Sequence, residues 1–109
     1  MTKKIIAVDL DGTLLNSESK LSDFTKETIK KISEKGHHVI ITTGRPYRMA
    51  KDFYRELELH TPMINFNGSL THLPGQAWAH EKCLTLDKKY LLDIVKRKEE
   101  IEADFIAGE

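Results

Sequence analysis

The sequence predicts an α/β fold with a doubly wound parallel sheet, and three short apolar runs are the first observation behind this prediction. They cover residues 5–8, 37–44 and 63–67 and are rich in β-branched side chains. Such unalternating runs are typical of strands buried on both faces of a sheet. Two helix-like segments separate the three runs. Strand, helix and strand at this spacing imply right-handed crossovers between parallel strands.

The segment between the first two strands carries signals for the start and the end of a helix. Ser22 or Asp23 can cap its start, because both side chains can accept a backbone N–H hydrogen bond. Gly36 stands where helices commonly end. The residues spaced to form one apolar face are Phe24, Ile29 and Ile32.

A second helix is predicted to begin at Pro46. Proline suits the first helical position, because its φ is already fixed and no N–H is needed there. Pro62 ends this segment, and the third strand follows it directly. The residues expected on the inward stripe of the second helix are Met49, Phe53 and Leu57.

The pattern changes after Asn67-Gly68. Residues 69–84 predict a hairpin around Pro74-Gly75, a dipeptide typical of turns. Residues 86–103 predict an amphipathic helix, and residues 104–109 resemble the opening of another strand. The side chains expected to face inward on that helix are Leu91, Leu92 and Val95.

Composition limits the class of protein. The chain has 109 residues, 39% of them hydrophobic, and 17 basic residues balance 17 acidic ones. This balance removes the bulk electrostatic case for binding nucleic acid or an anionic membrane. Cys83 is the single cysteine, which suits a reducing compartment. With no visible signal peptide and no apolar stretch of the ~20 residues that a membrane helix needs, we expect a cytoplasmic protein.

An acidic pair follows the first predicted strand. Asp9 and Asp11 are two positions apart, and such side chains point the same way when the backbone is extended. Two neighbouring carboxylates repel each other, so they need a shared proton or a cation. A hard divalent ion fits, and Mg²⁺ is the usual choice beside phosphate. Gly12 lets the backbone turn closely around a ligand.

The end of the second predicted strand supplies a complement to these acids. Thr43, Gly44 and Arg45 lead into a helix whose free N–H groups favour an anion. A phosphoryl group held there would meet a carboxylate, which can attack phosphorus and form an acyl-phosphate. Asp11 is then placed to protonate the leaving oxygen and later to deprotonate water.

Simpler interpretations of the acidic pair fit less well. An Asp-Gly hairpin turn needs a partner strand at once, whereas residues 16–20 are polar. A calcium loop starting at Asp9 would place Leu14 at the required glycine and Lys20 at the required glutamate. For Asn67-Gly68, a hairpin turn and a role in the site both remain open.

Three stretches resemble the haloacid dehalogenase-like (HAD) phosphohydrolase superfamily: "IIAVDLDGTLL", "VIITTGRP" and "INFNGSL". The last two are similar to its Cof-type branch. This resemblance implies a doubly wound, Rossmann-like core with an α/β cap inserted after the third core strand. On that pattern, residues 1–82 correspond to the N-terminal part of the core and residues 83–109 to the beginning of the cap.

The resemblance also implies roles for individual residues. Asp9 matches the nucleophile and Asp11 the general acid and base. Mg²⁺ would be held by the Asp9 carboxylate and the Asp11 backbone carbonyl, and Thr43 and the Gly44 amide would hold the phosphoryl oxygens. The further positions expected to line the site are Gly12, Arg45, Asn67 and Gly68.

The implied activity is Mg²⁺-dependent hydrolysis of a small phosphomonoester, a sugar phosphate or a nucleotide, through an aspartyl-phosphate. The family's later motifs, a lysine beyond the cap and an acidic Gly-Asp segment, do not occur in these 109 residues. We therefore expect an incomplete core that belongs to a longer protein. An incomplete sheet exposes an edge, which predicts self-association of this chain.

The alternative is a non-catalytic phosphate- or metal-binding module, such as a receiver-like phosphoacceptor. Receiver domains also combine a doubly wound sheet with an aspartate. Their acceptor lies at a later strand end, however, and their acidic pair lacks the spacing of Asp9 and Asp11. A single slow turnover would distinguish a receiver from a phosphatase.

Overall fold

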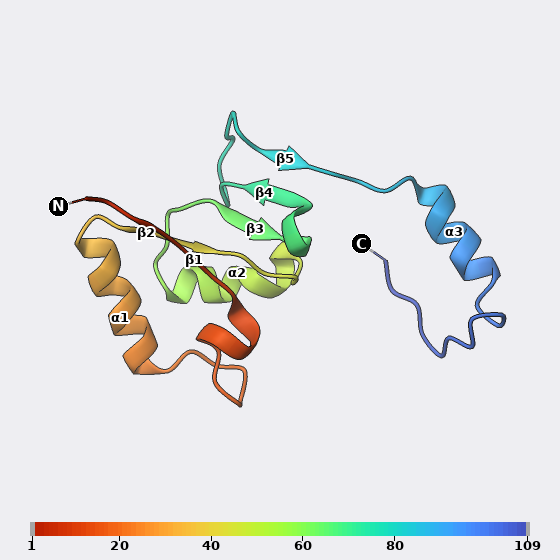
Figure 1. Cartoon of the computed structure of the whole chain (residues 1–109), viewed down its shortest axis with the longest axis horizontal. Helices are drawn as coiled ribbons and strands as arrows, with labels where there is room; N and C mark the ends of the chain where they lie inside the picture. Colours follow the sequence, from red (N-terminus) through yellow and green to blue (C-terminus); the bar gives the residue numbers. More distant parts are fainter. Residues whose placement is uncertain (1, 109) are drawn as a thin grey trace.

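Two parallel strands carry the acidic pair and the Thr43 loop at the same edge of the sheet (Figure 1). The computed structural model describes residues 2–108. β1 (Ile5–Val8) pairs in parallel with β2 (His38–Ile41), and α1 (Asp23–Glu34) connects them. The Ser22 hydroxyl caps α1 by accepting the N–H of Thr25 at 3.1 Å. The predicted strand, helix and strand unit is confirmed.

The second crossover continues the parallel arrangement. α2 (Tyr47–Glu56) leads to β3 (Met63–Asn65), which lies beside β2 through a parallel bridge between Thr42 and Ile64. β3 then pairs antiparallel with β4 (Leu70–His72), and β4 pairs with β5 (Lys82–Cys83). The expected hairpin around Pro74-Gly75 is thus the β4–β5 connection.

Side chains from both crossovers meet in one apolar core. Val39 and Ile41 of β2 and Met63 of β3 are fully buried. Ile29 of α1 and Tyr54 of α2 pack in the same cluster. Leu10, which lies between the two acids, is also fully buried and ties the loop after β1 to this core.

β1 differs from the prediction that it is buried on both faces. Ile5 is 71% exposed, and Ala7 is exposed as well. Within residues 2–108, β1 pairs only with β2, so one face and one edge of this strand lack cover. Its apolar side chains therefore alternate between half-buried and exposed.

The predicted inward faces of the two crossover helices are confirmed except at one position in each helix. Phe24 is 79% exposed, because five positions along a helix turn it about 140° away from Ile29. In α2 the buried residues are Ala50 and Tyr54, whereas Met49 is 47% exposed. Leu57, which caps the end of α2, is buried as predicted, and Phe53 packs half-buried against the core, so only Met49 of the predicted stripe faces away.

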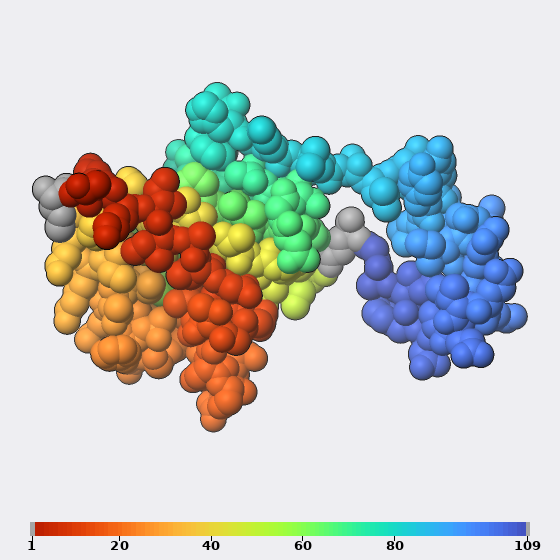
Figure 2. All heavy atoms as spheres, in the orientation of Figure 1, coloured from red at the N-terminus to blue at the C-terminus, as the bar shows by residue number. Residues whose placement is uncertain are grey.

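The C-terminal part lies apart from the sheet (Figure 1), and Figure 2 shows it as a separate lobe. α3 (Lys88–Lys96) is shorter than expected, and residues 104–108 form no strand, contrary to the prediction. No described segment buries the predicted inward stripe, so Leu91, Leu92 and Val95 are 37%, 58% and 47% exposed. The domain boundary at residue 83 stays a prediction.

Across residues 2–108, every helix is too short or too polar to cross a membrane.

Candidate active site

The loop after β1 presents both acids at the carboxyl end of the strand. Buried Leu10 holds the loop, and the Asp9 carboxylate accepts the Leu10 N–H at 2.7 Å through Oδ1. The chain then reverses at Gly12, whose φ of +76° is one that a side chain strongly disfavours. Asp9 and Asp11 both remain exposed to solvent.

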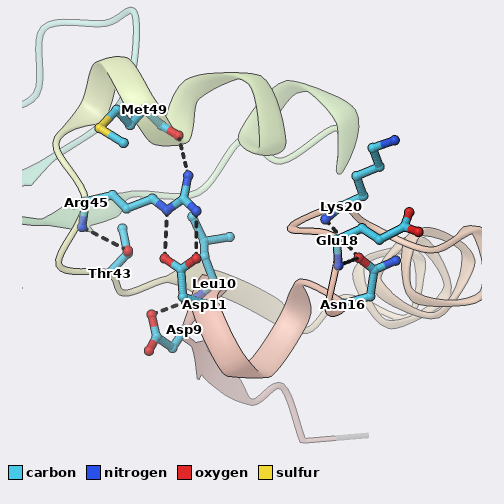
Figure 3. A network of polar contacts seen from close by, with 9 residues as sticks. All are labelled: Asp9, Leu10, Asp11, Asn16, Glu18, Lys20, Thr43, Arg45 and Met49. Carbon is cyan, nitrogen blue, oxygen red and sulfur yellow. Dashed lines mark hydrogen bonds and ion pairs between the residues drawn. The ribbon is translucent and has the colours of Figure 1, made fainter.

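The sequence predicted that an extended backbone would point the two carboxylates the same way, and the structure differs from this prediction. Asp9 and Asp11 are both extended, but Leu10 between them has helical dihedral angles, so the extended backbone is interrupted between the two acids. Figure 3 shows the Asp11 carboxylate turned toward Arg45, while the Asp9 carboxylate points elsewhere. A shared ligand for the two acids stays a prediction.

Arg45 binds Asp11 with two parallel hydrogen bonds (Figure 3). Its Nε donates to Oδ2 at 2.7 Å and its Nη2 donates to Oδ1 at 2.6 Å. The guanidinium also lies over the Phe53 ring, 5.5 Å from its centroid. The hydrogen bonds from Arg45 lower the pKa of Asp11, and Asp11 in turn raises the pKa of Arg45. Asp11 is therefore held in its ionised form.

The loop after β2 is fixed by backbone bonds on both sides. The buried Thr43 donates its N–H to the Ile64 carbonyl at 2.9 Å, and its Oγ1 accepts the Arg45 N–H at 3.0 Å. Accepting this bond leaves the Thr43 O–H available as a donor. Pro46 takes the position before the first helical residue rather than that residue itself, so α2 begins at Tyr47.

Asn67 and Gly68 form the β3–β4 turn and also approach the Thr43 loop. Asn67 has a φ of +53°, and its N–H donates to the Thr43 carbonyl at 3.2 Å. Its side-chain Oδ1 lies so close to Gly44 that a Cβ there would meet it at 2.9 Å. The turn role of Asn67 is therefore confirmed, and its side chain lies at the mouth of the candidate site.

A hollow of about 390 Å³ opens between these strand ends. Small-molecule sites commonly range from roughly 300 to 1,000 Å³. Of the predicted site residues, Asp9, Thr43, Gly44 and Asn67 line it. Asp11 and Arg45 do not line it but bind each other. Gly12 and Gly68 serve the two turns. The complete lining is Ala7, Val8, Asp9, Thr42, Thr43, Gly44 and Asn67.

The donor set suits a hard cation but is incomplete in this part of the chain. Asp9 and Asp11 offer carboxylate and carbonyl oxygens, the ligand type that Mg²⁺ prefers. Within residues 2–108, no group of three or more His, Cys, Asp or Glu side chains is arranged to hold a metal ion. Further ligands would have to come from water, substrate or other protein segments.

Two buried polar residues near the site were missed by the sequence analysis. Asn65 is fully buried and donates from Nδ2 to the Arg45 carbonyl at 3.0 Å. His72 is nearly buried and contacts Asn65 Oδ1 through Nε2 at 2.7 Å. The sequence offered one signal for these residues, a polar asparagine inside an apolar strand. The contact between Asn65 and His72 could not be predicted, because it depends on how β3 pairs with β4.

We expect the stability of this protein to fall as the pH drops below about 6.5, the ordinary pKa of histidine. Burial lowers the pKa of His72, and the negative charge of Glu81 opposes this only in part. The unfolded chain then binds more protons than the folded one, so acid favours unfolding. Urea unfolding between about pH 5 and pH 8 measures this effect. His72→Gln should flatten the dependence, and an unchanged slope in that variant would assign it to other groups.

Gly44→Ala should destabilise the protein by less than the ~1–3 kcal/mol of core overpacking, because the atom that must move ends an exposed side chain. The added Cβ would meet Asn67 Oδ1 at 2.9 Å, so the Asn67 side chain must move. Urea unfolding of Gly44→Ala measures the loss. In an Asn67→Gly background, measured against Asn67→Gly alone, Gly44→Ala should cost little, because the obstructing amide is gone and glycine tolerates the φ of +53° at position 67. A loss of equal size in both backgrounds would contradict this explanation.

These observations define an α/β protein whose polar site lies at the carboxyl ends of its parallel strands. The family model of haloacid dehalogenase-like hydrolases matches residues 6–108. The chain belongs to this family, and the resemblance expected from the sequence is confirmed.

Curated relatives carry phosphatase names. The chain is 45% identical over 93 residues to the 5-amino-6-(5-phospho-D-ribitylamino)uracil phosphatase YitU of Bacillus subtilis, covering 83% of this chain and 34% of that protein. It is 42% identical over 69 residues to the pyridoxal phosphate phosphatase YbhA of Escherichia coli, covering 63% of this chain and 25% of that protein. The chain thus spans about a third or less of the length of these relatives.

Solved structures share the fold. A haloacid dehalogenase-like hydrolase from Bacillus subtilis matches with a TM-score of 0.72 and 33% identity, covering 93% of this chain and 34% of that one. One from Bacteroides thetaiotaomicron matches with a TM-score of 0.78 and 24% identity, covering 93% and 39%. The predicted α/β fold class is therefore confirmed.

Proposed function

We propose that this chain supplies the nucleophile and the phosphate-binding loop of a phosphatase that acts on a small phosphomonoester. The observation that carries the proposal is the exposed Asp9 carboxylate, which lines one hollow together with Thr43 and Gly44. The phosphatase names of the relatives support the same reaction class.

In the first step, a carboxylate oxygen of Asp9 attacks phosphorus. The Leu10 N–H is bonded to Oδ1, which orients the carboxylate and leaves Oδ2 as the attacking atom. A bond forms between Oδ2 and phosphorus while the ester P–O bond breaks, and the leaving oxygen takes a proton. The Thr43 O–H and the Gly44 N–H, both from residues that line the hollow, stabilise the phosphoryl oxygens as hydrogen-bond donors.

Asp11 donates and accepts the protons of the reaction, and its ion pair with Arg45 determines when it can donate one. A carboxylate held ionised by a guanidinium has no proton to give. Asp11 must therefore leave Arg45 and take up a proton before it serves the leaving group. In the second step it accepts a proton from the water that attacks the aspartyl-phosphate, which releases phosphate and regenerates Asp9.

Mg²⁺ is proposed as the cofactor, on the family resemblance and on the oxygen donors present. The Asp9 carboxylate and the Asp11 backbone carbonyl would hold it. When bound, it supplies positive charge that offsets the repulsion between the carboxylate and the phosphate.

The substrate class is a small phosphorylated metabolite, a sugar phosphate or a nucleotide. Relatives are named for phosphorylated compounds of this size. Phosphate release from an aryl phosphate by the full-length protein, with and without Mg²⁺, tests the proposal. We expect many turnovers per protein with Mg²⁺ and loss of release on chelation. Release that stops at one phosphate per protein would favour the receiver-like alternative instead.

A further inference from the structure

Asn65 and His72 form a buried polar pair that the proposed reaction does not use. Asn65 is fully buried on β3, and His72 is 8% exposed on β4. The strands pair antiparallel with Met63 opposite His72 and Asn65 opposite Leu70. Asn65 and His72 are therefore diagonal neighbours on one face, within side-chain reach of each other. We call these two residues the Asn65–His72 pair.

The chemistry of the neighbours fixes the direction of each hydrogen bond in this pair. The Arg45 carbonyl can only accept, so the amide atom that faces it at 3.0 Å must be the nitrogen of Asn65. Oδ1 then faces His72 Nε2 at 2.7 Å, and an amide oxygen can only accept. His72 must therefore carry its proton on Nε2. The Tyr47 ring meets the imidazole edge-on, with centroids 5.0 Å apart, and helps to hold its plane.

The Asn65–His72 pair contacts the backbone of Arg45, the residue whose guanidinium binds Asp11. The Arg45 backbone is bound at both ends: its N–H donates to Thr43 Oγ1 at 3.0 Å, and its carbonyl accepts from Asn65. The N–H of Phe66 reaches the same carbonyl at 3.4 Å. With its backbone held in this way, the Arg45 guanidinium extends to the Asp11 carboxylate.

We propose that the Asn65–His72 pair is a positioning device, in which His72 orients the Asn65 amide, and Asn65 holds the Arg45 backbone so that its guanidinium meets Asp11. The proposal rests on the proposed function, because Arg45 and Asp11 belong to that site. It assigns His72 a role through other residues rather than through contact with substrate.

Substitutions of His72 in the full-length protein test this role. His72→Leu removes the donor, whereas His72→Gln places an amide nitrogen near the position of Nε2. With an aryl phosphate, we expect kcat to fall about tenfold in His72→Leu, because the site loses orientation, and to stay within about twofold in His72→Gln. In an Arg45→Met background, His72→Leu should cause no further loss, since coupled residues are not additive. An equal loss in both backgrounds would mean a purely structural role and would overturn the proposal.

Nuclear magnetic resonance provides a readout that does not depend on activity. We expect the Arg45 Nε–H to exchange slowly in the wild type and in His72→Gln, and rapidly in His72→Leu. If the wild type releases no phosphate while these signals behave as expected, the proposed function fails and the positioning role stands. A folded His72→Leu variant with an unchanged Arg45 signal would overturn the role. Should that variant not fold, the ring nitrogens of wild-type His72 decide: a proton on Nε2 supports the assignment, and one on Nδ1 overturns it.

Discussion

Asp9→Asn is expected to abolish phosphate release from an aryl phosphate, with kcat falling by at least about 10⁴-fold in the full-length protein. An amide oxygen is a far weaker nucleophile than a carboxylate, so the covalent step no longer occurs. The substitution should leave the fold intact, because asparagine keeps an oxygen that can accept the Leu10 N–H. The measurement is steady-state phosphate release with saturating Mg²⁺.

The chain offers a matched control for this variant. Asp23 is another exposed aspartate, whose side chain is 98% accessible at the start of α1 and lies outside the hollow. Asp23→Asn removes the same charge and should keep wild-type activity. Asp9→Asn with activity retained would remove the nucleophile assignment, and with it the proposed mechanism.

Asp11→Asn is expected to lower kcat by about 10²–10⁴-fold, the usual contribution of a general acid or base. An aryl phosphate has a good leaving group, so the first step needs little proton transfer. The second step does need a base, because water must lose a proton as it attacks the aspartyl-phosphate. The phosphorylated protein should therefore accumulate, and a burst of one leaving group per protein should precede slow turnover.

Mass spectrometry of the quenched Asp11→Asn reaction checks this prediction. One phosphoryl group per chain is expected on Asp9, and none in the Asp9→Asn, Asp11→Asn double variant. Rapid steady-state turnover without a phosphorylated intermediate would contradict the role of Asp11.

Arg45→Met separates the effect of the ion pair on the pKa of Asp11 from the proton transfer that the Asp11 carboxylate performs. It frees Asp11 without removing its carboxylate, so turnover should continue at about a tenth of the wild-type kcat, as in His72→Leu, while the pKa of Asp11 rises toward its ordinary value.

The fold was predictable where the signals are local. The apolar run at Ile5–Val8, the Ser22 cap and the Pro74-Gly75 turn all depend on residues close together in sequence, and each prediction is confirmed. Burial was predicted less well. Ile5 and Phe24 are apolar but exposed, because exposure depends on which element packs against a face and not on the side chain alone. The same reason explains the exposed stripe of α3.

The sequence by itself determined that Asp9 and Thr43 stand at the ends of parallel strands, because strand periodicity and crossover handedness bring such ends to one edge of a sheet. Only the tertiary structure decided what surrounds them. Arg45 meets Asp11 across 34 residues of sequence, and Asn65 reaches both the Arg45 carbonyl and His72. These contacts join separate strands and loops, and their geometry depends on the packing of the whole core, which no local pattern encodes.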